Sequence, residues 1–415
     1  MKPQPKNVSH FWKRDVSEVK IRIPRTVSLP SPLVLERYRR TPELGPKVLF
    51  FSGGSALKDT SLELVRYTHN SIHIITPFDS GGSSALLREA FHMPAIGDVR
   101  NRLLALADRS LHGNPEIFRL FAHRFPRDGE PENLAGELEK MIRGKHELVS
   151  CIPDPMRKII RHNLYLFRGF MPHSFDLRKA SLGNLILSGG YLDNRRNFDI
   201  IIYIFSKLVQ VRGIVRPVVN KYLHLITELE DGSVIIGQHN LTGKESSPIS
   251  SKVKKIFLSS SRENPFPADV RIRNKMKEMI GEADLICYPM GSFWSSLVAN
   301  LLPSGVGSAV AANLCPKVFI PNTGGKDPET FGMTFMEQVE QLTEYLRKDD
   351  PRKLSVTDLL NFIVIDSRNG DYGGDADTEL LKQQGVEIID IPLISPESRP
   401  YIDEKLLVPV LLSLA

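Results

Sequence analysis

The stretch Val48-Leu49-Phe50-Phe51-Ser52-Gly53-Gly54-Ser55 decides the fold, because four apolar, β-prone residues lead directly into a glycine pair. The pattern recurs at Ile72-His73-Ile74-Ile75, which leads through Asp79 into Gly81-Gly82-Ser83-Ser84. A helix-like segment follows each glycine pair, so the order strand, tight turn, helix occurs twice. Such turns leave unpaired N–H groups and the positive end of a helix at the carboxyl edge of a parallel sheet. Phosphate is the ligand that this arrangement favours.

Each glycine loop also has a structural interpretation. One such loop serves equally well as a tight turn, but two in succession favour phosphate binding. Asp79 could bond a ribose hydroxyl or help to hold Mg²⁺, and it is the candidate catalytic residue. Its alternative role is to cap the helix that starts near Ser83. The chain has no Gly-x-x-x-x-Gly-Lys-Ser/Thr loop, which excludes the P-loop NTPases.

A third candidate anion site follows a later strand, at Tyr288-Pro289-Met290-Gly291-Ser292. Gly291 and Ser292 would offer N–H and hydroxyl donors at a helix N-terminus. The alternative is a tight turn in which Ser292 is the N-cap. Asn322-Thr323-Gly324-Gly325 follows the next strand. Loops that follow parallel strands meet at one edge of the sheet, so we expect these segments to surround one crevice.

Polar side chains between these loops add candidate ligand contacts. Arg100 could grip a phosphate, and Asp98 could hold that arginine or bind a base, a ribose or a metal ion. The alternative is that Asp98 caps a helix and Arg100 forms a surface ion pair. Asn101 belongs to the same motif. Asn184 could read a nucleobase or support a buried turn. For Arg88, phosphate contact and solvent exposure on a helix are equal alternatives.

In these motifs the chain resembles the CofD/YvcK family from about Lys47 to its C-terminus. The motifs that carry the resemblance are Ser52-Gly53-Gly54, Asp79 to Ser84 with Leu87-Arg88, Ile96 to Asn101, Leu120-Phe121, Arg124-Phe125, Ser181 to Asn184, Val211 to Gly213, Pro289 to Ser292 and Asn300 to Leu302. The Gly-Gly-Ser-Ser loop and the Gly-Asp-x-Arg-Asn motif are similar to the YvcK branch. Where the family commonly has two adjacent acids, this chain has Asp79-Ser80, so the second carboxylate is missing. Ser52 and Ser55-Ala56 occupy a stretch that usually carries three glycines and a threonine.

The resemblance implies recognition of a nucleotide diphosphate. The CofD branch transfers a phospholactyl group from a guanosine-diphosphate-linked donor to a deazaflavin, with Mg²⁺. The YvcK branch is known as a UDP-sugar-binding regulator of carbon metabolism and cell shape. We therefore expect a protein that binds a nucleotide diphosphate-linked metabolite, first of all a UDP-sugar, with a metabolic or regulatory role. The alternatives are a phospholactyl-type transferase and a scaffold with a vestigial pocket.

Composition narrows the cofactors, partners and location that we expect. The chain has 415 residues, 41% of them hydrophobic, and no apolar run near the ~20 residues that span a bilayer. Its first residues contain no apolar segment typical of a secretory signal, so we expect a cytoplasmic protein. Cys151, Cys287 and Cys315 form no Cys-x-x-Cys pair. The sequence thus predicts neither zinc nor haem, leaves Mg²⁺ as the candidate cofactor, and allows a protein partner or homo-oligomer.

The basic charge is concentrated at the N-terminus. Residues 1–46 hold ten Lys and Arg against four Asp and Glu, and this excess of six equals the net charge of the whole chain, +6. The remainder is neutral overall, whereas a nucleic-acid-binding domain carries a basic face within its fold. The sequence therefore predicts no nucleic acid partner and a solvated, partly ordered arm.

Strand-like and helix-like segments alternate through residues 47–415, which predicts an α/β domain. We expect a Rossmann-like, doubly wound, mostly parallel sheet with two inserts. Residues 110–180 have the spacing of a helical insert. Residues 220–240 have the pattern of a β-hairpin that turns at Asp231-Gly232.

Overall fold

A computed structural model describes residues 26–109, 113–243, 248–323, 327–374 and 376–415. Its centre is a seven-stranded sheet in the order β3-β2-β1-β7-β8-β9-β10, in which every neighbouring pair is parallel. The strands are β1 (Val48–Ser52), β2 (Ile72–Ile75), β3 (Ile214–Pro217), β7 (Leu285–Tyr288), β8 (Lys317–Phe319), β9 (Phe362–Ile365) and β10 (Glu387–Asp390). The predicted Rossmann-like parallel sheet is confirmed.

The strand order reverses beside β1. From β1 the chain builds outward to β2 and β3, and it later returns to the other side of β1 as β7 and builds outward to β10. The loops after β1 and β7 therefore leave the sheet in a position where helices on opposite faces diverge. In open α/β sheets, ligands bind in the crevice at such a reversal, outside the carboxyl ends of the strands.

Alternating side chains make β1 the centre of a three-layer structure. Leu49 and Phe51 belong to the apolar cluster on one face, while Val48 and Phe50 belong to the cluster on the other. All four are buried, so both faces of the strand are covered. This is why a continuous apolar run, rather than a half-polar one, marks a central parallel strand.

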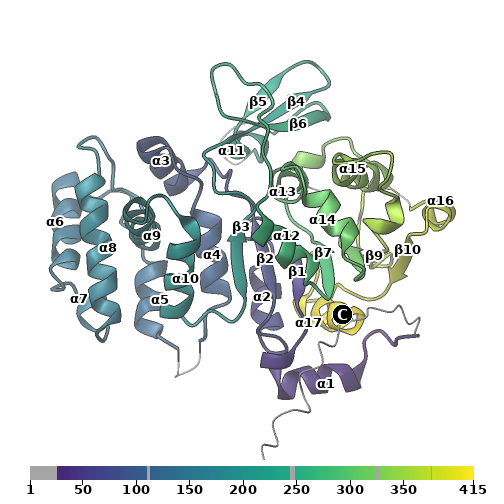
Figure 1. The fold of residues 1–415 in the computed structure, drawn as a ribbon, viewed down its shortest axis with the longest axis horizontal. Helices are drawn as coiled ribbons and strands as arrows, with labels where there is room; N and C mark the ends of the chain where they lie inside the picture. Colours follow the sequence, from purple (N-terminus) through teal and green to yellow (C-terminus); the bar gives the residue numbers. More distant parts are fainter. Residues whose placement is uncertain (1–25, 110–112, 244–247, 324–326, 375) are drawn as a thin grey trace, which may run out of the picture.

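Helices cover both faces of the sheet (Figure 1). The cluster around Val48 and Phe50 takes in α2 and α17, whereas the cluster around Leu49 and Phe51 takes in α12, α14 and α15. The bounds are α2 (Lys58–Leu64), α12 (Asn274–Gly281), α13 (Ala299–Leu301), α14 (Val306–Ala312), α15 (Phe335–Arg347), α16 (Thr378–Gln383) and α17 (Glu404–Leu414). A π-helical turn, Phe293–Val298, precedes α13.

A helical lobe lies beside β3, on the left in Figure 1. It contains α3 (Gly82–Phe91), α4 (Gly97–Ala105), α5 (Pro115–Ala122), α6 (Pro131–Ile142), α7 (Glu147–Ser150), α8 (Met156–Phe170), α9 (Leu182–Asp193) and α10 (Phe198–Leu208). These helices share one apolar cluster, which also includes Ile75 of β2 and Val215 of β3. The structure thus places four helices within the expected helical segment 110–180. Among the described residues, no helix has the length and apolar character needed to cross a bilayer.

The expected hairpin is part of a three-stranded antiparallel sheet at the top of Figure 1. Its strands are β4 (His224–Leu229), β5 (Val234–Ile236) and β6 (Val253–Ser259), and the short helix α11 (Gln238–Leu241) follows β5. The sequence analysis did not predict β6 or β3. β6 is an edge strand whose apolar pattern is interrupted by Lys254 and Lys255, and β3 is an edge strand that ends in Pro217. Edge strands tolerate both lysine and proline.

The described part of the N-terminal arm packs on the C-terminal helix. Helix α1 (Pro32–Arg40) contacts α17, and the Ser31 N–H donates to Ser413 Oγ over 2.8 Å. A short 3₁₀ turn, Pro42–Leu44, leads on to β1. Residues 26–46 are thus attached to the α/β body rather than extended into solvent. The part of the expected solvated arm in residues 1–25 lies outside the described residues.

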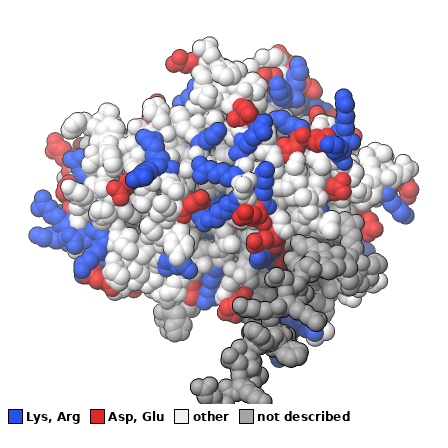
Figure 2. Space-filling view, viewed as in Figure 1, with Lys and Arg blue, Asp and Glu red and all other residues white. Residues whose placement is uncertain are grey.

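The neutral body carries a local basic cluster that its net charge does not reveal. A small groove at the carboxyl end of β3 is lined by five cationic side chains and one acid, namely Arg216, Lys221, Arg271, Arg273, Lys275 and Asp199. Figure 2 shows Lys and Arg side chains gathered near the centre of this face. Only Arg216 of the five has an ion pair with the lining acid, at 3.4 Å.

We predict that Gly189→Ala lowers the free energy of unfolding. In the contact between α8 and α9, a Cβ at Gly189 would collide with the carbonyl oxygen of Asn163. Overpacking of this kind costs about 1–3 kcal/mol. Gly136→Ala on α6 is the matched control, because a Cβ there meets open space, and it should add about 0.5–1 kcal/mol. Urea unfolding of both variants checks the prediction, which fails if the two substitutions have equal effects.

Candidate functional site

A buried arginine holds the glycine loop that follows β1. Arg102, on α4, is fully buried and donates to the carbonyl oxygens of Leu57 at 2.6 Å and Gly53 at 3.1 Å, and to Ser61 Oγ. The C=O and N–H groups of a trans peptide point in opposite directions. With the Gly53 carbonyl turned toward Arg102, the N–H of Gly54 faces away from it. Burial lowers the pKa of Arg102 to about 10, so the guanidinium remains charged at neutral pH.

Both glycines of this loop are closely approached by side chains. A Cβ at Gly53 would collide with Ser296 Oγ, and a Cβ at Gly54 would collide with the carboxylate of Asp98. Asn300, buried beyond the π-helical turn, links the two sides by donating to the carbonyl oxygens of Ser52 at 3.1 Å and Ser296 at 2.8 Å. The loop after β1 is therefore fixed against both α4 and the segment after β7.

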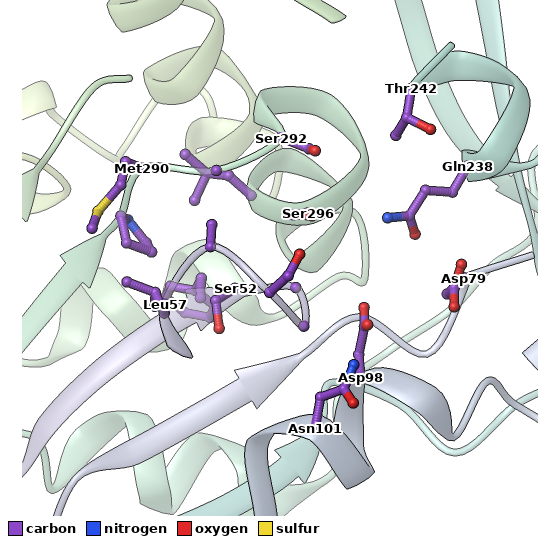
Figure 3. Close-up of a pocket in the computed structure, with 18 residues that line it drawn as sticks. Ser52, Leu57, Asp79, Asp98, Asn101, Gln238, Thr242, Met290, Ser292 and Ser296 are labelled. Atoms are coloured by element: carbon purple, nitrogen blue, oxygen red, sulfur yellow. The ribbon is translucent and has the colours of Figure 1, made fainter. Parts of the chain in front are cut away.

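These segments enclose a cavity of ≈ 250 Å³ at the reversal between β1 and β7 (Figure 3). Nine of the predicted site residues line it: Ser52, Gly53, Gly54, Ser55, Asp79, Asp98, Asn101, Gly291 and Ser292. The loops after β1, β2 and β7 and the first turn of α4 thus meet at one edge of the sheet, as their order along parallel strands predicts. The lining residues that the sequence analysis missed include Gln238, Thr242 and Ser296.

The charged side chains that line the cavity are all acidic. Asp79 and Asp98 line it, and no Lys or Arg does so in the described part of the chain. Burial raises the pKa of Asp79, while hydrogen bonds from the Gly81 N–H, at 3.0 Å, and from Ser84 oppose that rise. Asp79 does not cap α3, whose N-cap is Gly81, so the capping interpretation was wrong. A diphosphate in this cavity would need a cation to offset the repulsion between its own negative charge and that of the two carboxylates.

The helix N-terminus after β7 is occupied by the protein's own carboxyl groups. Asp327 accepts the N–H of Phe293 at 2.9 Å. Glu329 accepts the N–H groups of Trp294 and Ser295, at 2.9 and 2.8 Å, and the Ser295 hydroxyl at 2.5 Å. These N–H groups are the ones that an anion would otherwise contact.

The Gly291 N–H has a protein partner as well. It donates to Asn322 Oδ1 at 2.8 Å, so the expectation that it serves a ligand is corrected. Ser292 is the N-cap residue, but its side chain makes no cap hydrogen bond. Of the loop that begins at Asn322, Gly324 and Gly325 lie outside the described residues.

The remaining predicted residues support the site from behind and do not line the cavity. Arg88 is buried and donates to the carbonyl oxygens of Pro77 and Leu223, which fits neither of its two expected roles. Arg100 is buried and donates to Ser181 Oγ and to Asn101 Oδ1. Asn184 lies within α9 and donates to Ser83 Oγ at 2.9 Å.

The second glycine loop likewise stays outside the cavity lining. Gly81 and Gly82 lie at the start of α3, where Gly82 has φ +52°, and Ser84 is buried against Gly97 and Asp79. Its contribution is indirect, because the loop positions Asp79.

The residues present fit a Mg²⁺ ion only together with a ligand. No group of three or more His, Cys, Asp or Glu able to hold a metal occurs among the described residues. Mg²⁺ commonly binds through one or two carboxylates plus substrate phosphates and water. Asp79 and Asp98, which line the same cavity, match that requirement. In such a complex, Asp98 on α4 would take the place of the second carboxylate that is absent at Ser80.

The family model described as "2-phospho-L-lactate transferase CofD" matches residues 48–394. The chain belongs to the CofD family. The gluconeogenesis factor of Bacillus subtilis is 28% identical over 301 residues, covering 72% of this chain and 75% of that protein. The gluconeogenesis factor of Halalkalibacterium halodurans is 29% identical over 300 residues, covering 72% and 73%. The relationship to the CofD/YvcK family that the motifs indicated is confirmed.

A solved structure supports the fold. The chain is similar to the crystal structure of a UPF0052 family member from Bacillus halodurans, with a TM-score of 0.63 and 24% identity. The alignment covers 88% of this chain and 99% of that one.

We predict that Glu329 makes stability depend on pH. Burial and the neighbouring Asp327 raise the pKa of Glu329 from its ordinary value of 4.5 to about 8. Between these two values the folded protein keeps a proton that the unfolded chain has lost, so the free energy of unfolding falls as pH rises. Glu329→Gln should reduce this slope, measured by urea unfolding from pH 4.5 to 8. Glu344→Gln, on an exposed position of α15, is the control, and an unchanged slope in Glu329→Gln would contradict the prediction.

Proposed function

We propose that the chain binds a nucleotide diphosphate-linked metabolite, with UDP-sugars as the first candidates, in the cavity between β1 and β7. One observation carries the proposal. The cavity lies at the strand-order reversal and is bordered by the glycine loop after β1. Arg102 holds the Gly53 carbonyl of this loop, so that the N–H of Gly54 faces away from Arg102. This leaves N–H groups for phosphate oxygens at the position where α/β folds bind nucleotides.

Charge indicates the form in which the ligand binds. Two carboxylates and no cationic side chain line the described cavity, so a bare diphosphate would be repelled. Bound as its Mg²⁺ complex, the diphosphate would place the ion toward Asp79 and Asp98. The ion would supply charge neutralisation, while the glycine loop and Asn101 would position phosphate oxygens.

Size limits how much of the ligand is enclosed. Sites for drug-sized ligands usually measure about 300–1,000 Å³. At ≈ 250 Å³ the cavity is slightly smaller, so we expect part of a nucleotide sugar to extend beyond its mouth. A group at that mouth could meet a second substrate or a partner protein.

The alternative is transfer of a phospholactyl-type group from a nucleotide diphosphate-linked donor. The two carboxylates that line one cavity favour it, because phosphoryl-type transfer depends on positioning and charge neutralisation. The relatives named gluconeogenesis factors favour the binding and regulatory role. For that role we further propose a cytoplasmic location and a protein partner or a homo-oligomer through which ligand binding acts.

We predict that ligand binding depends on Mg²⁺ and on the two acids. A ligand at 100 times its Kd should stabilise the wild-type protein by about 2.7 kcal/mol in thermal-shift experiments with UDP- and GDP-linked compounds. Asp79→Asn and Asp98→Asn should each raise the Kd at least tenfold with Mg²⁺, a change of about 1.4 kcal/mol. Calorimetric titration with and without EDTA checks this. Asp193→Asn, at the exposed end of α9, is the control.

Three results distinguish the regulatory role, the transferase and the scaffold. Binding without turnover in a product assay supports the regulatory role. If the wild type turns over and Asp79→Asn abolishes that turnover while its Kd changes by less than about tenfold, the transferase is supported. If no nucleotide binds in either condition, the proposal fails and the scaffold interpretation stands.

A further inference from the structure

Helix α11 carries an unassigned polar side chain into the candidate cavity. The helix is an addition to the Rossmann-like core, since it follows β5 of the antiparallel sheet. Gln238 at its start and Thr242 just after its end both line the cavity. In Figure 3, Gln238 and Asp98 point toward the same space, beside Asp79. The antiparallel sheet thus completes a pocket whose other walls come from the parallel sheet.

The side-chain oxygen of Gln238 lacks a hydrogen-bond partner. Gln238 Oε1 is buried, and the described residues provide no donor for it. Leaving a buried polar group unpaired is costly, so most such groups in proteins have partners. Thr242 differs, because its hydroxyl already donates to the carbonyl oxygen of His239 at 3.1 Å. Gln238 is therefore the α11 side chain that a ligand would satisfy.

Several contacts hold Gln238 in place. Gly237 has φ +91°, donates its N–H to the Leu225 carbonyl at 2.8 Å, and approaches Ser80 so closely that a Cβ would lie 2.6 Å from Ser80 Oγ. Ser80 Oγ also lies 2.6 Å from His239 Nδ1. The start of α11 is thus joined both to β4 and to the loop that carries Asp79. A side chain on such a support can discriminate between ligands, because it cannot readily move away from a wrong one.

The surroundings of Gln238 determine what kind of group it binds. Phosphate oxygens are acceptors and cannot satisfy the Gln238 carbonyl. An uncharged N–H or O–H donor can, and a nucleotide sugar carries such donors on its base and on its sugars. We infer that Gln238 is a specificity-determining residue that accepts a hydrogen bond from an uncharged N–H or O–H of the ligand. This inference rests on the proposed function.

The test is a double-mutant cycle between Gln238 and the ligand. Wild type and Gln238→Leu are titrated by calorimetry with UDP-glucose, its 3-methyluracil analogue, its 2′-deoxyribose analogue and UDP. In wild type, the compound that lacks the bonded donor should bind about 10- to 100-fold more weakly than UDP-glucose. In Gln238→Leu that penalty should fall to less than threefold, and the compound whose penalty disappears identifies the donor.

Further variants exclude a general loss of structure. Gln383→Leu, exposed on α16, should keep every penalty, and Gln238→Glu should keep the penalty because it retains an acceptor oxygen. His239→Ala should reduce the penalty by releasing α11 from Ser80, whereas His239→Asn, which can still hydrogen-bond to Ser80 Oγ, should restore it.

The outcomes separate this inference from the proposed function. If wild type binds UDP-glucose and all penalties are the same in Gln238→Leu, the inference is overturned and the proposed function stands. Loss of Mg²⁺ dependence alone in Gln238→Leu also overturns it, because Gln238 would then be a metal ligand. If wild type binds none of these compounds or their GDP-linked counterparts, both fail together.

Discussion

The buried guanidinium of Arg102 is the interaction on which the candidate site depends. It fixes the carbonyl oxygens of Gly53 and Leu57, and through them the path of the loop between β1 and α2. The loop in turn sits so close to Ser296 and Asp98 that a Cβ at either of its glycines would force these side chains to shift. The Arg102 guanidinium lies behind the loop, where it orders the backbone and does not line the cavity. Arg88 and Arg100 are likewise structural in this respect, since both donate hydrogen bonds to protein oxygens.

The segment after β7 shows the opposite arrangement. Its helix N-terminus is filled by the side-chain oxygens of Asp327 and Glu329, two carboxyl groups that occupy the place of an external ligand. Burying these acids raises the pKa of both, yet their hydrogen bonds to the first N–H groups hold the π-helical turn against the 328–330 turn. The two sides of the cavity therefore have different roles. On the β1 side the loop turns an N–H group away from Arg102, whereas on the β7 side the N–H groups are already bonded to protein oxygens.

The sequence was sufficient to predict the architecture because the strongest signals are local. Apolar runs such as Val48–Phe51 lead into glycine pairs, and strands buried on both faces are near-continuous apolar runs. The edge strands β3 and β6 were missed because their pattern is broken by proline or lysine. At the site, the loop residues were found since glycine pairs mark them, whereas Gln238, Arg102 and Glu329 were not. Their roles depend on contacts with residues far away in the chain, which spacing does not encode. The same holds for the basic groove near β3, which assembles from segments around residues 216–221 and 271–275.

The acidic lining of the cavity has a consequence for selectivity among the states of one ligand. A nucleotide diphosphate in solution exchanges between a free polyanion and a metal complex of lower charge, and a wall of carboxylates disfavours the first. Occupancy of the cavity would then follow the concentration of the complex rather than that of total nucleotide. A protein with this pocket would respond jointly to the metabolite and to the supply of divalent cation. Falling magnesium would empty the site even at constant metabolite.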